Sequence, residues 1–63
     1  MGDEAQLSSV SASLDELARR VSGVADGYAG DESTESLAGE LYEVERALRS
    51  AIRRLDRLVR DLR

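Results

Sequence analysis

Arginine is the residue type in this chain with the clearest capacity for chemistry. Seven of the nine arginines lie between residues 46 and 63, and the chain contains no lysine. The planar guanidinium group binds phosphate and carboxylate oxygens in pairs, so a row of arginines on one helix could bind nucleic acid or a nucleotide. The candidate anionic-ligand face consists of Arg46, Arg49, Arg53, Arg57 and Arg60.

Helical spacing gives a simpler interpretation of these arginines. Glu45 lies four residues before Arg49, and Asp56 lies four residues before Arg60, so the charges can pair along one helix. Such surface pairs contribute only ~0.3 to 0.5 kcal/mol each. The net charge of −4 and the aromatic content of 3% also argue against a surface for phosphates and stacked bases. We therefore expect a solvated face, with nucleic-acid binding and an acidic protein partner as the alternatives.

Catalysis and metal binding have little support in the residue types present. The chain has no histidine, cysteine or lysine, which removes the usual general base, the thiol nucleophile and the Schiff-base amine. Glu40 and Glu43 share a helix face and could hold a divalent ion, but they lack the histidine that accompanies glutamates in bundle metal sites. We expect both glutamates to be solvated, and we predict no enzymatic activity, no cofactor and no metal site.

Two long amphipathic helices would position these side chains. Large apolar residues recur at alternating spacings of three and four, which is the a and d pattern of a heptad repeat. The first array is Leu7, Val10, Leu14, Leu17, Val21, Val24 and Tyr28. The second array is Leu37, Leu41, Val44, Leu48, Ala51, Leu55, Leu58 and Leu62. In this register Arg46, Arg53 and Arg60 occupy the outward f position.

Glycines and hydroxyl residues between the arrays predict a turn. The three glycines of residues 23–30 favour a helix end, and Ser33 or Thr34 offers an N-cap oxygen. Helices joined by so short a connection pack antiparallel, so the predicted fold is all-α: an antiparallel helical hairpin, or two-helix coiled coil. The predicted elements of this single domain, residues 1–63, are a helix over about 4–28, a turn over about 29–33 and a helix over about 34–62.

The apolar surface of this hairpin is wider than two helices need. The e positions also include apolar residues, at Ala18, Ala25, Ala38, Ile52 and Val59. Three apolar residues per heptad are typical of a bundle rather than a lone helix pair. Pairing the helices about a centre near residue 31 also leaves Leu58, Val59 and Leu62 beyond the start of the first helix. We therefore predict dimerisation into a four-helix bundle. The predicted oligomer or partner interface is Leu41, Val44, Leu48, Ile52, Leu55, Leu58, Val59 and Leu62.

The turn resembles that of one known group of helical hairpins. GYAG at residues 27–30 resembles the Trp-x-Gly turn of the hairpin proteins exported by type VII secretion systems, with Tyr28 in place of tryptophan and Gly30 matching. The export signal of that family would require an acid four residues after Tyr42, where this chain has Arg46. The resemblance implies a secreted helical hairpin, which is a further alternative.

A second short pattern lies in the C-terminal helix. Ser50, Arg53 and Asp61 are spaced similarly to part of the cyclic-di-GMP signature of an actinobacterial anti-sigma hairpin. The flanking positions are Arg46 and Arg57, where that signature has Glu and Gln.

The chain as a whole is typical of an interaction module. We predict a non-enzymatic protein–protein interaction or oligomerisation module that serves as a small adaptor or regulatory subunit. No run approaches the ~18 apolar residues of a membrane span, so we expect a cytoplasmic protein without membrane contact. A homodimer is the expected state, and a heterologous helical or acidic protein is the alternative partner.

Overall fold

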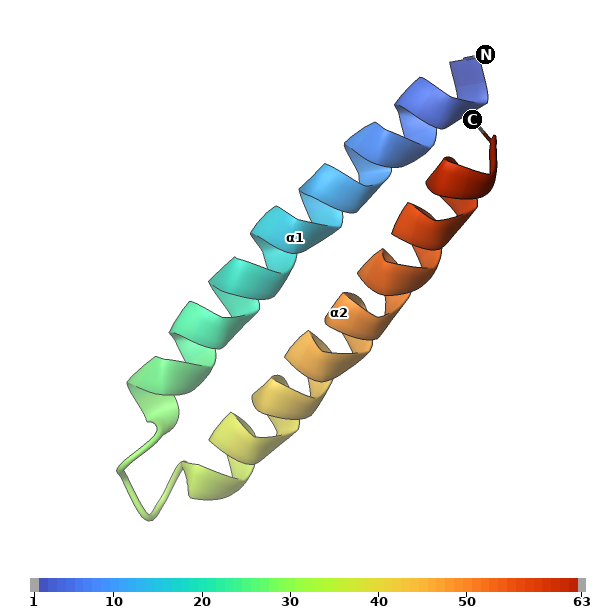
Figure 1. Cartoon of the computed structure of the whole chain (residues 1–63). Coiled ribbons are helices and arrows are strands. Elements are labelled where there is room, and N and C mark those ends of the chain that lie inside the picture. The colour runs from blue at the N-terminus through green and yellow to red at the C-terminus, as the bar shows by residue number, and fades with distance from the viewer. Residues whose placement is uncertain (1, 63) are drawn as a thin grey trace.

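Two antiparallel helices make up the structure (Figure 1). The computed structural model describes residues 2–62, in which α1 spans Gly2–Tyr28 and α2 spans Glu35–Leu62. The helices lie side by side along their length, and the start of α1 lies at the same end of the molecule as the end of α2. The predicted all-helical hairpin is confirmed.

The turn between the helices is held by hydrogen bonds among its own residues. At the end of α1 the N–H of Ala29 donates to the carbonyl of Ala25 (3.0 Å), and Gly30 then turns the chain with a φ of +93°. A residue with a Cβ atom is strained in this left-handed region, so glycine is favoured just past a helix end. Asp31 accepts hydrogen bonds from the backbone N–H and the hydroxyl of Ser33, at 3.0 and 2.9 Å.

Thr34 joins the end of one helix to the start of the next. Its hydroxyl donates to the carbonyl of Tyr28 (2.8 Å), and its carbonyl accepts the N–H of Ala38 (3.0 Å). Thr34 therefore occupies the N-cap position of α2. Of the three glycines that favoured a helix end, Gly23 and Gly27 lie inside α1 and Gly30 alone makes the turn.

The helices contact each other through their a and e positions. The buried residues, which are all e positions, are Ser11, Ala18, Ala25, Ala38 and Val59. Small side chains at these positions allow the two helices to approach closely. The a positions beside them, such as Leu14 and Leu48, are half-buried. The a and d seam expected from the spacing is therefore replaced by an a and e seam, which leaves the d positions outside except for the half-buried Ala51.

Contacts between the helices also set their register. Ser11 contacts Asp56, whereas the predicted pairing would place residue 11 opposite about residue 51. This shift of about one turn brings Leu58 and Leu62 beside Leu7, with which they line one surface hollow. The expectation that the end of α2 extends past α1 was wrong, because α1 begins at Gly2 and the turn uses residues up to Thr34.

The hairpin is an elongated, flat body. Its Cα atoms extend over 49 × 14 × 10 Å, so the two broad faces on either side of the helix pair are its largest surfaces. Within residues 2–62, neither helix has the combination of length and apolarity that crossing a lipid bilayer requires.

Candidate interaction surface

The d positions of both helices form an exposed apolar face. Because the helices are antiparallel and contact each other through a and e, both sets of d side chains lie on the same broad side of the hairpin. The apolar face consists of Val10, Leu17 and Val24 of α1 and Leu37, Val44 and Leu58 of α2. These six side chains are each 44–54% exposed, which is unusual for so many leucine and valine side chains on one side of a helix pair.

The opposite broad side is closed by polar contacts between the helices, and we call it the polar face. The hydroxyl of Ser11 donates to Oδ1 of Asp56 at 2.7 Å, and Nη1 of Arg49 donates to Oδ1 of Asp15 at 3.3 Å. Nearer the turn, the Tyr42 hydroxyl donates to Oδ1 of Asp26 at 2.5 Å. These contacts use b, e and f positions, so one broad side of the hairpin carries polar contacts between the helices and the other is apolar.

Arg49 is the most connected charge on the polar face. Its Nε donates to Oε2 of Glu45 at 3.0 Å, in addition to its contact with Asp15, which also pairs with Arg19 at 2.6 Å. The hydrogen bond with Glu45 is the main reason that the pKa of Arg49 is raised. The predicted pairing of Glu45 with Arg49 is confirmed. Asp56, which was expected to pair with Arg60, accepts the hydrogen bond from Ser11.

Tyr42 lies at the edge of the polar face and is partly exposed. The hydrogen bond from its hydroxyl to Asp26 is the main reason that the pKa of Tyr42 is raised. The nearby negative charges of Asp26, Glu45 and Glu35 raise this pKa further, because they disfavour the tyrosinate. The ring therefore presents a hydroxyl group that is already oriented toward α1.

The core that the hairpin builds for itself is very small. Within residues 2–62 the buried apolar side chains are three alanines and Val59, and no large side chain is fully buried. A chain of 63 residues is near the lower limit for independent folding even with a good core. The side chains that would normally fill such a core instead lie on the apolar face.

The predicted interface residues are divided between the two surfaces of α2. Val44, Leu58 and Leu62 are exposed on or beside the apolar face. The others lie in the seam with α1, where Val59 is buried and the rest are half-buried: Leu41, Leu48, Ile52 and Leu55. The prediction did not include the half of the apolar face that α1 contributes, nor Leu37. Their shared d position with Val44 and Leu58 was the signal that would have identified them.

Ser11 is another seam residue that the spacing of large apolar residues does not identify. It is 7% exposed, and its hydroxyl makes the hydrogen bond that joins the first half of α1 to the last half of α2. It lies seven residues before Ala18 and fourteen before Ala25, so continuing the e positions toward the N-terminus would have placed it in the seam.

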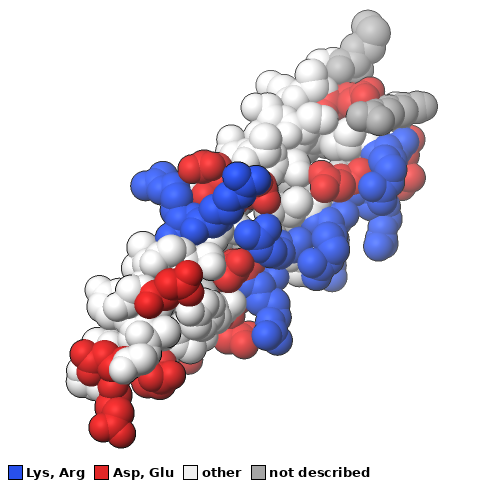
Figure 2. Space-filling view, turned by 60° about the vertical axis from the view of Figure 1, so that its left-hand side comes forward, with Lys and Arg blue, Asp and Glu red and all other residues white. Residues whose placement is uncertain are grey.

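The candidate arginine face does not form a single site. Arg46, Arg49 and Arg53 line a hollow on the polar side with Tyr42 and Glu45. Arg57 instead lines a hollow with Arg54 and Leu58, and Arg60 lines a third with Ser8, Asp56 and Val59. Figure 2 shows acidic side chains at the turn end of the molecule and arginine side chains farther along it. The charges are therefore separated along the hairpin more clearly than around it.

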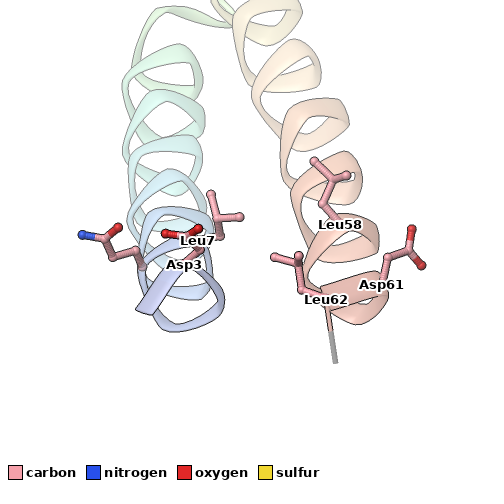
Figure 3. Close-up of a pocket in the computed structure, with 6 residues that line it drawn as sticks. Asp3, Leu7, Leu58, Asp61 and Leu62 are labelled. Carbon is pink, nitrogen blue, oxygen red and sulfur yellow. The ribbon is translucent and has the colours of Figure 1, made fainter. Parts of the chain in front are cut away.

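An open apolar hollow lies at the end opposite the turn (Figure 3). Leu7 of α1 projects toward Leu58 and Leu62 of α2, and Asp3 and Asp61 lie at the rim. Leu62 is 54% exposed, so these side chains line the hollow without burying one another. The hollow continues the apolar face to the end of the hairpin.

The described residues include no obvious site for a metal ion. Within residues 2–62, no group of three or more histidine, cysteine, aspartate or glutamate side chains gathers closely enough to hold one. Glu40 and Glu43 are both exposed.

In comparisons with known proteins, no family model matches the chain, and no curated protein or solved structure is significantly similar to it.

Proposed function

We propose that this chain is a non-enzymatic self-association module, in which the apolar face of one hairpin packs on the apolar face of a second copy to form a four-helix bundle. The observation that supports the proposal is the pairing of a large exposed d surface with a seam that buries nothing larger than valine. Four-helix bundles of this kind bury a, d and e positions together. The second hairpin would supply the missing side of the core.

The size of the apolar face is adequate for a stable dimer. The broad side of the hairpin measures 49 × 14 Å between Cα atoms, or about 700 Å². A typical stable interface buries about 800 Å² on each partner. Burial contributes roughly 25 cal/mol for each Å² of apolar surface, so burial of the leucine and valine side chains of the apolar face provides a substantial driving force.

A second copy is the partner that this surface fits best. Twofold symmetry requires only that one surface be complementary to itself, and a row of branched aliphatic side chains meets that condition by interdigitation. The polar face would stay outside in such a bundle, with Tyr42 and the hollow lined by Arg46, Arg49 and Arg53. We propose that this outer side is where an adaptor or regulatory subunit would contact a further protein.

Sedimentation equilibrium at micromolar concentration tests this proposal. We expect a dimer, and we expect the double variant Leu17→Gln, Val44→Gln to raise the dimer dissociation constant by more than about a hundredfold, because each dimer loses four buried aliphatic side chains. Ala12→Gln is the matched control, since Ala12 is exposed at an outward f position of α1 and should leave the dimer intact. A stably helical monomer of the unmodified chain would contradict the proposal.

A further inference from the structure

Four charged residues lie along the outer edge of the apolar face, and the order of their charges along α2 distinguishes between possible orientations of two copies. Glu40 and Glu43 lie in the half of α2 near the turn, and Arg54 and Arg57 lie in the other half. All four are exposed, and no ion pair between described residues involves any of them. Arg54 and Arg57 line one hollow with Leu58, so they lie directly beside the apolar face.

Their positions along α2 are symmetric. The midpoint of α2, Glu35–Leu62, falls between Leu48 and Arg49. Glu40 and Arg57 lie equally far from that midpoint on its two sides, and Glu43 and Arg54 form a second such pair. A twofold axis through the midpoint of α2 would therefore place Glu40 level with Arg57 of the second helix, and Glu43 level with Arg54.

Two twofold arrangements would bury the whole apolar face. In the first, the turns lie at opposite ends of the bundle, and α2 packs antiparallel on α2 of the partner. In the second, the turns lie at the same end, and α2 packs on α1 of the partner. The two arrangements bury the same side chains, so the apolar contacts do not distinguish them and the charges at the edge decide.

We propose that two copies pack with their turns at opposite ends, so that Glu40 and Glu43 of each copy pair with Arg57 and Arg54 of the other. This inference rests on the proposed self-association and specifies its geometry. Each pair forms twice in the dimer, because the twofold axis exchanges the copies. Opposite charges facing across an interface fix its register and disfavour the wrong alignment.

The alternative arrangement has poorer charge complementarity. It would place Arg54 and Arg57 beside the part of α1 between Ser9 and Glu16, where Glu16 is the one acid on this edge, and it would bring two acidic turn ends together. The acids at each turn end are Asp26, Asp31, Glu32 and Glu35. Figure 2 shows the acidic turn end and, farther along the molecule, the arginines. With the turns at opposite ends of the bundle, the acidic end of each copy lies beside the arginine-rich end of the other.

Charge reversal tests the pairing directly. Glu40→Arg, Glu43→Arg is one variant and Arg54→Glu, Arg57→Glu is the other. Each alone places like charges opposite one another, and we expect its dimer dissociation constant to rise about tenfold or more at low salt. Mixed in equal amounts, the two variants restore both sets of opposite charges, so a heterodimer as tight as the original dimer is expected. Two variants that stay weak when mixed would overturn the pairing.

The matched control is Arg46→Glu, Arg53→Glu. It makes the same change in net charge as the second variant, but both side chains lie in the hollow of the polar face. It should leave the dissociation constant within about twofold of the original, and it should not be rescued by the first variant. A control that weakens the dimer equally would show that net charge alone is responsible.

A single spin label measures the orientation independently. Because the chain has no cysteine, Ser36→Cys gives one labelling site, at the start of α2. With the turns at opposite ends, the labels lie about 40 Å apart at 1.5 Å per residue, and with the turns together they lie within about 20 Å. A short distance in a dimer would overturn this orientation while leaving self-association intact. Absence of intermolecular coupling, with a monomer by sedimentation, would overturn both proposals.

Discussion

Small side chains decide how closely the two helices approach. Ser11, Ala18 and Ala25 on α1 and Ala38 on α2 are the buried residues over most of the seam. A serine in this row is tolerated because its hydroxyl has a partner in Asp56, and an unpaired buried hydroxyl would be destabilising. The leucine and valine side chains beside this row therefore project outward to the apolar face.

Gly30 is the residue at which adding a methyl group tests the conformation of the turn most directly. Its φ of +93° is strained for any residue with a Cβ atom, so Gly30→Ala should lower the free energy of unfolding by about 1 kcal/mol. Gly39 is the matched control: it lies inside α2 with no atom within 4 Å of an added Cβ, so Gly39→Ala should raise stability by about 0.5 to 1 kcal/mol. Urea denaturation followed by circular dichroism measures both, and equal effects of the same sign would contradict this account of the turn.

Tyr42 gives a prediction about pH. Its hydrogen bond to Asp26 raises its pKa in the folded chain above the ordinary value of about 10, so the bond contributes stability below that pH. The contribution should be lost as the pH rises through the folded pKa. In a Tyr28→Phe background, ultraviolet titration of the remaining tyrosine should give a pKa above 10, and Asp26→Ala should return it toward 10. An unchanged titration on removing Asp26 would contradict the contact.

At the scale of the elements, the helices were predictable from spacing and the seam was not. Alternating steps of three and four give two amphipathic helices, and the glycine and hydroxyl residues near position 30 give the turn. The a and d positions of both arrays and most e positions are apolar, however, and two helices can bury only two of these three rows. The choice depends on side-chain size, because the small e residues permit a close contact that the larger d residues would prevent.

The register depended on contacts that spacing does not describe. It follows from the bonds of Asp31 and Thr34 in the turn and from the pairing of Ser11 with Asp56. For the same reason the candidate surface was only partly predicted. Leu58 and Val44 were identified on α2, but Leu17 and the other d residues of α1 were assigned to the seam. An a and d seam between two helices leaves no row of apolar residues facing outward.

The whole molecule is asymmetric in two directions, in polarity across its thickness and in charge along its length. Across its thickness, one broad side is apolar and the other carries paired polar groups. Along its length, residues 1–45 carry eleven acids and two arginines, whereas residues 46–63 carry seven arginines and two acids. The first asymmetry favours a second copy stacked on the apolar face. The second favours a copy that runs in the opposite direction.

Folding and association should therefore be a single transition. If the hairpin completes its core only in the dimer, raising the chain concentration a hundredfold should stabilise the folded state by about 2.7 kcal/mol. For a dimer of this size the thermal midpoint should then rise by on the order of 10 °C. Circular dichroism melts across that range measure the shift. The Leu17→Gln, Val44→Gln variant should melt at a lower temperature at each of these concentrations, because its hairpins pack on one another more weakly. A midpoint of the unmodified chain that stays constant would mean that the seam of small residues, with its three cross-helix polar contacts, is sufficient for folding.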